Sequence, residues 1–162
     1  MRTQKEMKQL VLPLLKRKGR IYRKFKKILA RKAKGKEVIT TITRDGKETI
    51  NRAKYGDYIV KNQTFAGEEY ILNPKQFRSR YRYVKRSSNG FSEYEPIGKI
   101  IAIEVNEKIL KKFKVRRRFY FEAIWGAKMI AKERDYLACP IGGNEVYRIA
   151  RSEFFQTYKL VN

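Results

Sequence analysis

The sequence predicts an α+β fold, in which a basic N-terminal helical arm precedes two related small β-rich units in pseudo-twofold arrangement. Three observations lead to this prediction: apolar residues recur at helical spacing near the N-terminus, β-branched and aromatic residues cluster in short runs further on, and one segment is repeated. Each unit is expected to be a strand, a turn, a strand and a short helix. The expected segments are 1–36 for the arm, 37–86 for the first unit, 87–118 for a connection with a strand and a short basic helix, and 119–162 for the second unit.

The arm is expected to form two amphipathic helices. Apolar residues are spaced by three or four in both, at Met7, Leu10, Val11, Leu14 and Leu15 and then at Ile21, Phe25, Ile28 and Leu29. Pro13 is expected to kink or start a helix, and Gly19 to join the two pieces. The second helix is expected from about Arg20 to Lys34, with Gly35 as its stop.

Positive charge is the main functional signal. The chain has 40 Lys and Arg against 16 Asp and Glu, a net charge of +24, and residues 1–36 hold 15 bases and one acid, or 15 − 1 = +14. Such an excess indicates a polyanionic partner. The face of the second helix opposite its apolar stripe is expected to bind phosphates through Arg20, Arg23, Lys24, Lys26, Lys27, Arg31 and Lys34. A solvated helix and a membrane-surface helix are the alternatives.

Short strands and helices are expected in the rest of the chain. Asp45-Gly46 is a hairpin turn signal between strands at 38–43 and 48–53. The other expected strands are 58–61, 69–72, 99–105, 119–124, 128–132, 135–139 and 146–150. Short helices are expected after Asn73, Asn106 and Ser152, each of which is a residue type that caps helices.

An internal repeat relates two parts of this region. Asp57-Tyr58 aligns with Asp135-Tyr136 at an offset of 78 residues, and after a one-residue gap Glu68, Tyr70, Phe77 and Tyr81 align with Glu145, Tyr147, Phe154 and Tyr158. In a structural interpretation, the aspartates accept backbone N–H bonds in turns and the aromatic rings fill the core of each unit. In a functional one, the repeats form a ligand pocket with Glu68, Tyr70, Glu145 and Tyr147.

The repeated segments resemble a family of small bacterial and phage proteins named for a Pro-Gly-Asp-Tyr-Gly motif. The resemblance rests on Tyr55-Gly56-Asp57-Tyr58 and on Asp135-Tyr136-Leu137, and it extends over about 50–84 and 119–160. Tyr55 and Glu133 stand where the motif has Pro, and Arg134 stands where it has Gly. The resemblance implies a related fold and assigns no function.

Two further basic runs contain aromatic residues. The first, residues 76–86, offers Arg80, Arg82, Tyr83, Lys85 and Arg86 to a nucleic acid. If it is a strand, Arg80, Arg82 and Lys85 share a face, and Tyr83 is the better stacking candidate because Leu160 is its repeat counterpart. The second run, residues 111–119, offers Arg116, Arg117 and Arg118 to phosphates. The alternative for both is a solvated rim.

The residue types disfavour catalysis and metal binding. There is no His, and Cys139 is the single Cys, so the common general base, triads and metal sites lack their residues. The apolar run at 10–15 is too short to span a membrane. We therefore expect a cytoplasmic (intracellular), non-enzymatic nucleic-acid-binding protein without a cofactor, metal or catalytic residues. RNA in a ribonucleoprotein assembly is favoured over DNA, and the alternative is a small anionic nucleotide held in a pocket between the repeats.

Overall fold

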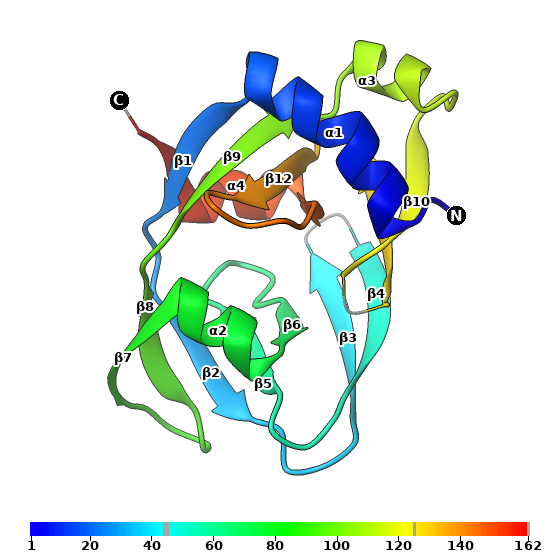
Figure 1. Ribbon diagram of the computed structural model, residues 1–162. Helices are drawn as coiled ribbons and strands as arrows, with labels where there is room; N and C mark the ends of the chain where they lie inside the picture. The colour runs from blue at the N-terminus through cyan, green and yellow to red at the C-terminus, as the bar shows by residue number, and fades with distance from the viewer. Residues whose placement is uncertain (44–45, 125, 162) are drawn as a thin grey trace. The chain divides into compact units, whose positions relative to one another are not determined.

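The computed structural model describes residues 1–43, 46–124 and 126–161. It is α+β, as the sequence predicts, with a helix at the N-terminus and antiparallel strands in several sheets (Figure 1). The chain divides into two compact units. Unit 1 comprises Met1–Arg23, Lys99–Phe155 and Lys159–Asn162, and unit 2 comprises Lys24–Gly98 and Gln156–Tyr158.

Unit 1 contains a five-stranded sheet with the strand order β13-β12-β9-β1-β14, and a separate hairpin, β10-β11. Its elements, some of whose end residues belong to unit 2, are α1 (Gln4–Lys18), β1 (Arg20–Lys24), β9 (Lys99–Glu104), α3 (Glu107–Lys112), β10 (Arg118–Glu122), β11 (Lys128–Lys132), β12 (Tyr136–Pro140), β13 (Tyr147–Ile149), α4 (Arg151–Thr157) and β14 (Tyr158–Leu160).

Helix α1 covers the core of unit 1. The Thr3 hydroxyl caps the helix by accepting the Glu6 N–H, and the helix continues through Pro13 to Lys18. Its apolar face buries Met7, Val11 and Leu15 in one cluster with residues of β10 and β12. Figure 1 shows α1 beside β9 and β10. The predicted amphipathic helix at the N-terminus is therefore confirmed.

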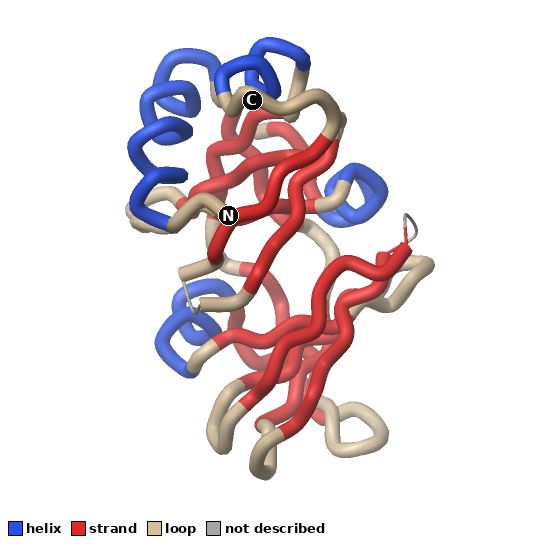
Figure 2. Tube along the Cα trace, turned by 90° about the vertical axis from the view of Figure 1, so that its right-hand side faces the viewer, coloured by secondary structure: helices blue, strands red, loops and turns tan. Residues whose placement is uncertain are grey.

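Unit 2 contains a second five-stranded sheet, with the order β6-β5-β2-β8-β7, and a second hairpin, β3-β4. Its strands are joined by loops and by the short helix α2, and Figure 2 shows the strands and helices of the chain in different colours. Of the predicted Asp45-Gly46 turn, Asp45 lies outside the described residues. The elements of unit 2 are β2 (Ile28–Lys32), β3 (Glu37–Thr43), β4 (Gly46–Ala53), β5 (Tyr58–Asn62), β6 (Glu69–Leu72), α2 (Pro74–Arg80), β7 (Tyr81–Arg86) and β8 (Ser92–Pro96).

The two five-stranded sheets have the same connectivity. In each, a central strand is followed by a hairpin, its antiparallel partner, an outer strand, a short helix and the strand at the other edge, and only in unit 1 does a further helix, α3, come between the central strand and the hairpin. The registers also correspond, because Val60 lies opposite Tyr70 as Ala138 lies opposite Tyr147. The strand between the central strand and this last edge strand is β8 in unit 2 and β1 in unit 1. The repeat detected in the sequence thus has the same strand pairing in both copies.

Aromatic stacking closes the core of each sheet in the same way. Tyr58 stacks on Phe77 with ring centroids 3.9 Å apart and planes at 5°, and Tyr136 stacks on Phe154 at 3.7 Å and 11°. Phe77 and Phe154 are fully buried. Of the rings that the repeat places in register, Phe77, Tyr81, Tyr136 and Phe154 are buried, as the structural interpretation predicts, whereas Tyr58, Tyr70, Tyr147 and Tyr158 are half-buried.

The predicted helix from Arg20 to Lys34 is wrong, because this segment forms β1 and β2. Strand β1 pairs with β9, and β2 lies between β5 and β8, so the backbone N–H and C=O groups bond to other strands. Ile28 and Ala30 are buried while Leu29 between them is half-buried, which is the period of a strand. Spacing by three or four residues favoured a helix, and pairing with distant strands overrides that local preference.

The helical stripe predicted for this segment is not a packing face. Ile21 and Phe25 are 41% and 42% exposed, and Ile28 is completely buried. The opposite cationic face predicted for the helix therefore does not exist as one surface.

The other differences from the predicted elements are smaller. Helix α4 begins at Arg151, so Ser152 lies in its first turn and is not its cap. Strands β8 and β14 were not predicted, and the other predicted elements are present with ends shifted by two residues or fewer.

Candidate nucleic-acid interface

The connection from α3 to β10 presents the densest positive charge of unit 1. Asn106 caps α3 by accepting the Ile109 N–H at 3.0 Å, and Lys114 turns the chain with a φ of 57°. The Val115 N–H then bonds to the Leu110 carbonyl at 3.0 Å, which fixes the chain reversal. All six cations of this segment are exposed, namely Lys111, Lys112, Lys114, Arg116, Arg117 and Arg118.

The aromatic residues of the same segment belong to the protein interior. Phe113 and Phe119 are 1% and 4% exposed, and their rings stack at 4.3 Å with planes at 14°. They anchor both ends of the cationic segment to the core of unit 1. Their burial leaves the cations, and not these rings, to meet a ligand.

A groove of about 690 Å³ lies beside this segment in unit 1. Its volume falls in the range of small-molecule sites. Three cations and one carboxylate line it, so its local charge is positive. The lining residues are Met1, Arg2, Glu6, Phe113, Val115, Arg118, Phe119, Tyr120 and Lys128.

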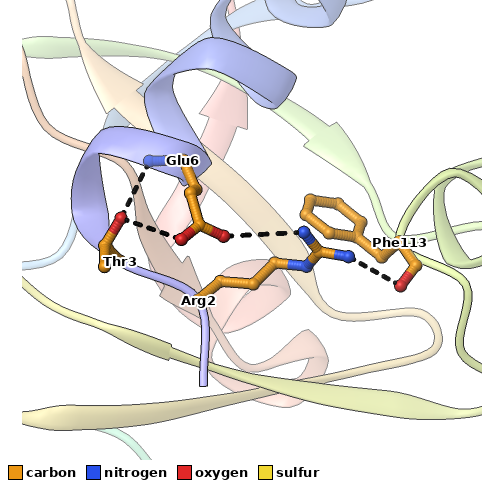
Figure 3. A network of polar contacts seen from close by, with 4 residues as sticks. All are labelled: Arg2, Thr3, Glu6 and Phe113. Carbon is orange, nitrogen blue, oxygen red and sulfur yellow. Dashed lines mark hydrogen bonds and ion pairs between the residues drawn. The ribbon is translucent and has the colours of Figure 1, made fainter.

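Arg2 lines the groove and is held by backbone and side-chain contacts, and Figure 3 shows its guanidinium between the Glu6 carboxylate and the Phe113 carbonyl. Its N–H donates to the Tyr120 carbonyl at 3.1 Å, and its carbonyl accepts the Glu122 N–H at 2.8 Å. Its guanidinium donates to the Phe113 carbonyl at 2.9 Å and lies 4.9 Å from the centre of that ring. The Glu6 carboxylate is 3.7 Å away. These contacts orient a cation at the groove without burying it.

Tyr120 and Lys128 form the other polar part of the groove. Along β10, Phe119 and Phe121 point into the core, whereas Arg118 and Tyr120 are exposed, because side chains alternate along a strand. The Lys128 ammonium lies 4.3 Å from the centre of the Tyr120 ring. Sequence analysis missed Arg2, Tyr120 and Lys128 as site residues. The alternation in residues 118–122 was the available signal for Tyr120.

The first basic run, residues 76–86, spans the end of α2 and β7, an edge strand of unit 2. A bulge in β7 sets Arg82 opposite Glu95 and Lys85 opposite Glu93, so these two cations are on one face, whereas Arg80, which was predicted to share that face, is the last residue of α2. Arg82 is paired with Glu95 at 2.7 Å. Tyr83 is 55% exposed and meets Tyr94 edge to face at 5.6 Å.

In the same run, Tyr81 is buried, which agrees with its interpretation as a core residue. Arg80 is half-buried, and Arg86 is exposed. The run therefore combines surface cations with one exposed ring, Tyr83.

The seven cations predicted to bind phosphates between Arg20 and Lys34 have three different environments. Arg20, Arg23, Lys27 and Lys34 are exposed, and Lys26 is half-buried. Arg31 forms a two-pronged ion pair with Glu37, at 3.1 and 2.8 Å. The hydrogen bonds from Arg31 lower the pKa of Glu37, and the bond to Glu37 raises the pKa of Arg31. Lys24 is buried.

Lys24 is thus not a phosphate-binding residue, contrary to the prediction. The strand alternation of β1 turns its side chain inward, and it is only 7% exposed. Its ammonium donates to Asn62 Oδ1 at 2.9 Å, to the Tyr81 hydroxyl at 2.8 Å and to the Tyr70 hydroxyl at 3.2 Å. It also lies 6.0 Å from the centre of the Tyr158 ring. The buried charge is stabilised by hydrogen bonds to uncharged oxygen atoms and by aromatic faces.

The buried ammonium affects the two tyrosines differently. Burial raises the pKa of Tyr70 well above its ordinary value, and the nearby Tyr81 hydroxyl raises it further. Burial also acts to raise the pKa of Tyr81, but the charge and hydrogen bond of Lys24 outweigh it and lower that pKa. The two hydroxyls are 2.7 Å apart, so they titrate as a pair.

The residues of the alternative ligand pocket lie in different units. Glu68 and Tyr70 belong to unit 2, where Glu68 accepts hydrogen bonds of 2.5 Å from Asn62 and from Thr64. Glu145, which is buried, and Tyr147, which is half-buried, belong to unit 1. Within unit 2, the Lys24 ammonium donates a hydrogen bond directly to the Tyr70 hydroxyl. It is linked to Glu68 through the Asn62 side chain, which accepts from Lys24 and donates to Glu68.

No protein-family model, curated protein sequence or solved structure matches this chain. The resemblance to the Pro-Gly-Asp-Tyr-Gly proteins therefore stays a prediction. Within the part of the chain that the structure describes, no helix has both the length and the apolar character needed to cross a bilayer.

Proposed function

We propose that this chain is a non-enzymatic nucleic-acid-binding protein that holds the phosphate backbone of RNA, or of DNA. The observation that carries the proposal is the segment 111–118, whose six cations are exposed without an ion-pair partner among the described residues. Like charges this close repel one another, and among the described residues no carboxylate forms an ion pair with them. A polyanion would supply the missing counter-charge.

Cations on other surfaces extend this interface. The proposal removes Lys24, which is buried, and Arg31, which is half-buried and held by two bonds to Glu37; Lys27 and Arg82 also pair with glutamates but are exposed. A spread of contacts suits RNA within a ribonucleoprotein assembly better than one DNA sequence, because no base-reading motif accompanies it. The proposed contacts are Arg20, Arg23, Lys26, Lys27, Lys34, Arg80, Arg82, Tyr83, Lys85, Arg86, Arg116, Arg117 and Arg118.

We also propose that the two units are copies of one ancestral unit. The shared strand order, the corresponding registers and the paired ring stacks support this. The predicted pseudo-twofold arrangement of the units stays a prediction.

The nucleic-acid proposal is tested by affinity measured against salt concentration. Purified protein should retain nucleic acid, seen as excess absorbance at 260 nm, and its affinity for RNA should fall steeply with salt. Reversing both Arg116 and Arg117 to Glu should reduce the slope of log affinity against log salt by about 2. The matched control reverses Lys61 and Lys75, which are exposed in unit 2 and outside the proposed contacts.

Two results would contradict the proposal. A wild-type affinity that does not change with salt would exclude binding through phosphates. Equal losses in the Arg116/Arg117 and Lys61/Lys75 variants would show attraction to net charge rather than contact with the 111–118 segment. Saturable binding of a mononucleotide that is lost on changing Glu68 or Tyr70 would instead favour the alternative pocket function.

A further inference from the structure

The groove of unit 1 combines a cationic rim with one accessible ring. Tyr120 is 37% exposed and lines the groove together with Arg118 and Lys128. The rest of the aromatic lining, Phe113 and Phe119, is buried and forms its apolar base. Cations beside an exposed ring are the elements with which proteins bind single-stranded nucleic acids.

We infer that this groove binds one nucleotide of a single-stranded nucleic acid, with its base stacked on Tyr120 and its adjoining phosphates contacted by Arg118 and Lys128, which lie on either side of Tyr120 along the hairpin. The inference rests on the proposed function and deepens it, because it names the strandedness of the ligand and the residue that senses it. It differs from backbone contact at 111–118, which any polyanion satisfies.

The contact between Lys128 and Tyr120 supports a stacking role for the ring. An ammonium 4.3 Å from the ring centre is attracted by the electron-rich π face. Lys128 is exposed, so its long side chain can leave that position when a base arrives. Its ammonium then stays beside the nucleotide, where the phosphate carries the opposite charge.

Arg2 and Tyr120 are preorganised in the groove, because both are held by hydrogen bonds of the β10-β11 hairpin. Arg2 is fixed by two backbone hydrogen bonds and by its bond to the Phe113 carbonyl. Tyr120 lies on β10, whose five residues are paired in register with β11. A ring on a paired strand loses little conformational freedom on binding, which favours affinity.

Duplex nucleic acid cannot use this site in the same way. Its bases are stacked on each other and present only their edges in the grooves. A duplex would therefore meet the exposed cations of 111–118 without engaging the Tyr120 ring. The groove therefore predicts that the protein prefers single strands to duplexes. Positive charge alone predicts no such preference.

The test compares a short fluorescent oligonucleotide, single-stranded or annealed to its complement, with the full-length protein. Tyr120→Ala should weaken single-strand binding at least about fivefold and leave duplex binding unchanged, whereas Tyr120→Phe should bind as the wild type does. Tyr55→Ala, at a tyrosine that is 82% exposed and far from the groove in sequence, is the matched control and should have no effect.

A second measurement separates stacking from folding. An oligonucleotide carrying 2-aminopurine should lose fluorescence when bound by the wild type and by Tyr120→Phe, and should keep it with Tyr120→Ala, while all variants melt at the same temperature. Equal affinities of the wild type for single strand and duplex would overturn the inference, and so would an unchanged single-strand affinity in Tyr120→Ala. If binding still depended on salt in these cases, the proposed function would stand. If the wild type showed no salt-dependent binding at all, both proposals would be overturned.

Discussion

Asp57 and Asp135 make the same backbone contact in the two units. Each carboxylate accepts a hydrogen bond from the N–H three residues earlier, at 3.0 Å for Asp57 and 2.8 Å for Asp135. Their carbonyls accept the N–H groups of Ala33 and Val105, both at 2.7 Å. The prediction that these aspartates bond backbone groups in turns is confirmed. Asp135 has additional partners, because it also accepts Arg148 Nε at 2.9 Å.

Replacing the two aspartates by alanine should therefore have unequal effects. Asp57→Ala removes a turn hydrogen bond and should lower the free energy of unfolding by about 0.5 to 2 kcal/mol. Asp135→Ala also removes one partner of a buried ion pair and should cost about 3 to 5 kcal/mol. Urea unfolding measures both. Equal losses would show that the bond to Arg148 contributes nothing.

Arg134→Gly should stabilise the protein. Arg134 has a φ of 76° at the position where the other turn has Gly56 with a φ of 88°. A side chain is strained in this region and glycine is not, so the native state should gain about 1 kcal/mol, reduced by the greater freedom of glycine in the unfolded chain. Gly56→Ala is the reverse change and should destabilise. A lower melting temperature for Arg134→Gly would contradict this explanation.

Lys24→Met should change both stability and tyrosine ionisation. Loss of the donor leaves buried oxygens with fewer bonds and should cost about 1 to 3 kcal/mol. It should also raise the pKa of Tyr81, because the ammonium is what lowers it. Ultraviolet titration should show Tyr81 ionising below the ordinary value of about 10 in the wild type and at higher pH in Lys24→Met. Lys27→Met, which changes an exposed lysine, is the control.

The pH dependence of stability follows from the same shift. A lowered pKa of Tyr81 in the folded state means that the unfolded chain holds more protons between that pKa and about 10. The contribution of Tyr81 should therefore grow as the pH rises through this window and be lost as the pH falls below the folded-state value. The raised pKa of Tyr70 acts in the opposite direction at higher pH. If the free energy of unfolding changed with pH in the same way in the wild type and in Lys24→Met, Lys24 would not be the cause of the lowered pKa of Tyr81.

Deleting residues 1–35 should unfold the protein rather than remove an independent arm. The deletion takes Met7, Val11 and Leu15 from the core of unit 1 and Ile28 from the core of unit 2. It also takes β1 and β2, which lie inside the two sheets. Circular dichroism and thermal melting should show no cooperative transition. A truncated protein that melts cooperatively near the wild-type temperature would contradict this role.

Local patterns were sufficient for most elements of the fold. Asn73 followed by Pro74 predicted α2, and the structure forms the full capping box there, in which Gln76 bonds back to Asn73. The repeat predicted the rings that stack in each core, since equal positions in two copies of one unit have equal neighbours. These features depend on residues close in sequence or on comparison within the chain.

The groove could not be predicted in the same way. Arg2 and Tyr120 are far apart in sequence, and only the pairing of the N-terminal residues with the β10-β11 hairpin brings them together. The sequence identified Arg118 as a candidate but offered no reason to connect it with Lys128. Contacts between distant segments depend on how strands pair, and charge patterns do not encode that pairing.

The sequence by itself determined the excess of positive charge, the helix at the N-terminus and the repeated turn, strand and ring positions, because each depends on composition or on neighbouring residues. Tertiary structure alone decided that the segment after Gly19 forms strands and that Lys24 is buried. The physical reason is that the backbone of β1 and β2 bonds to strands distant in the chain, and the alternation of those strands turns one lysine inward among two tyrosines and an asparagine.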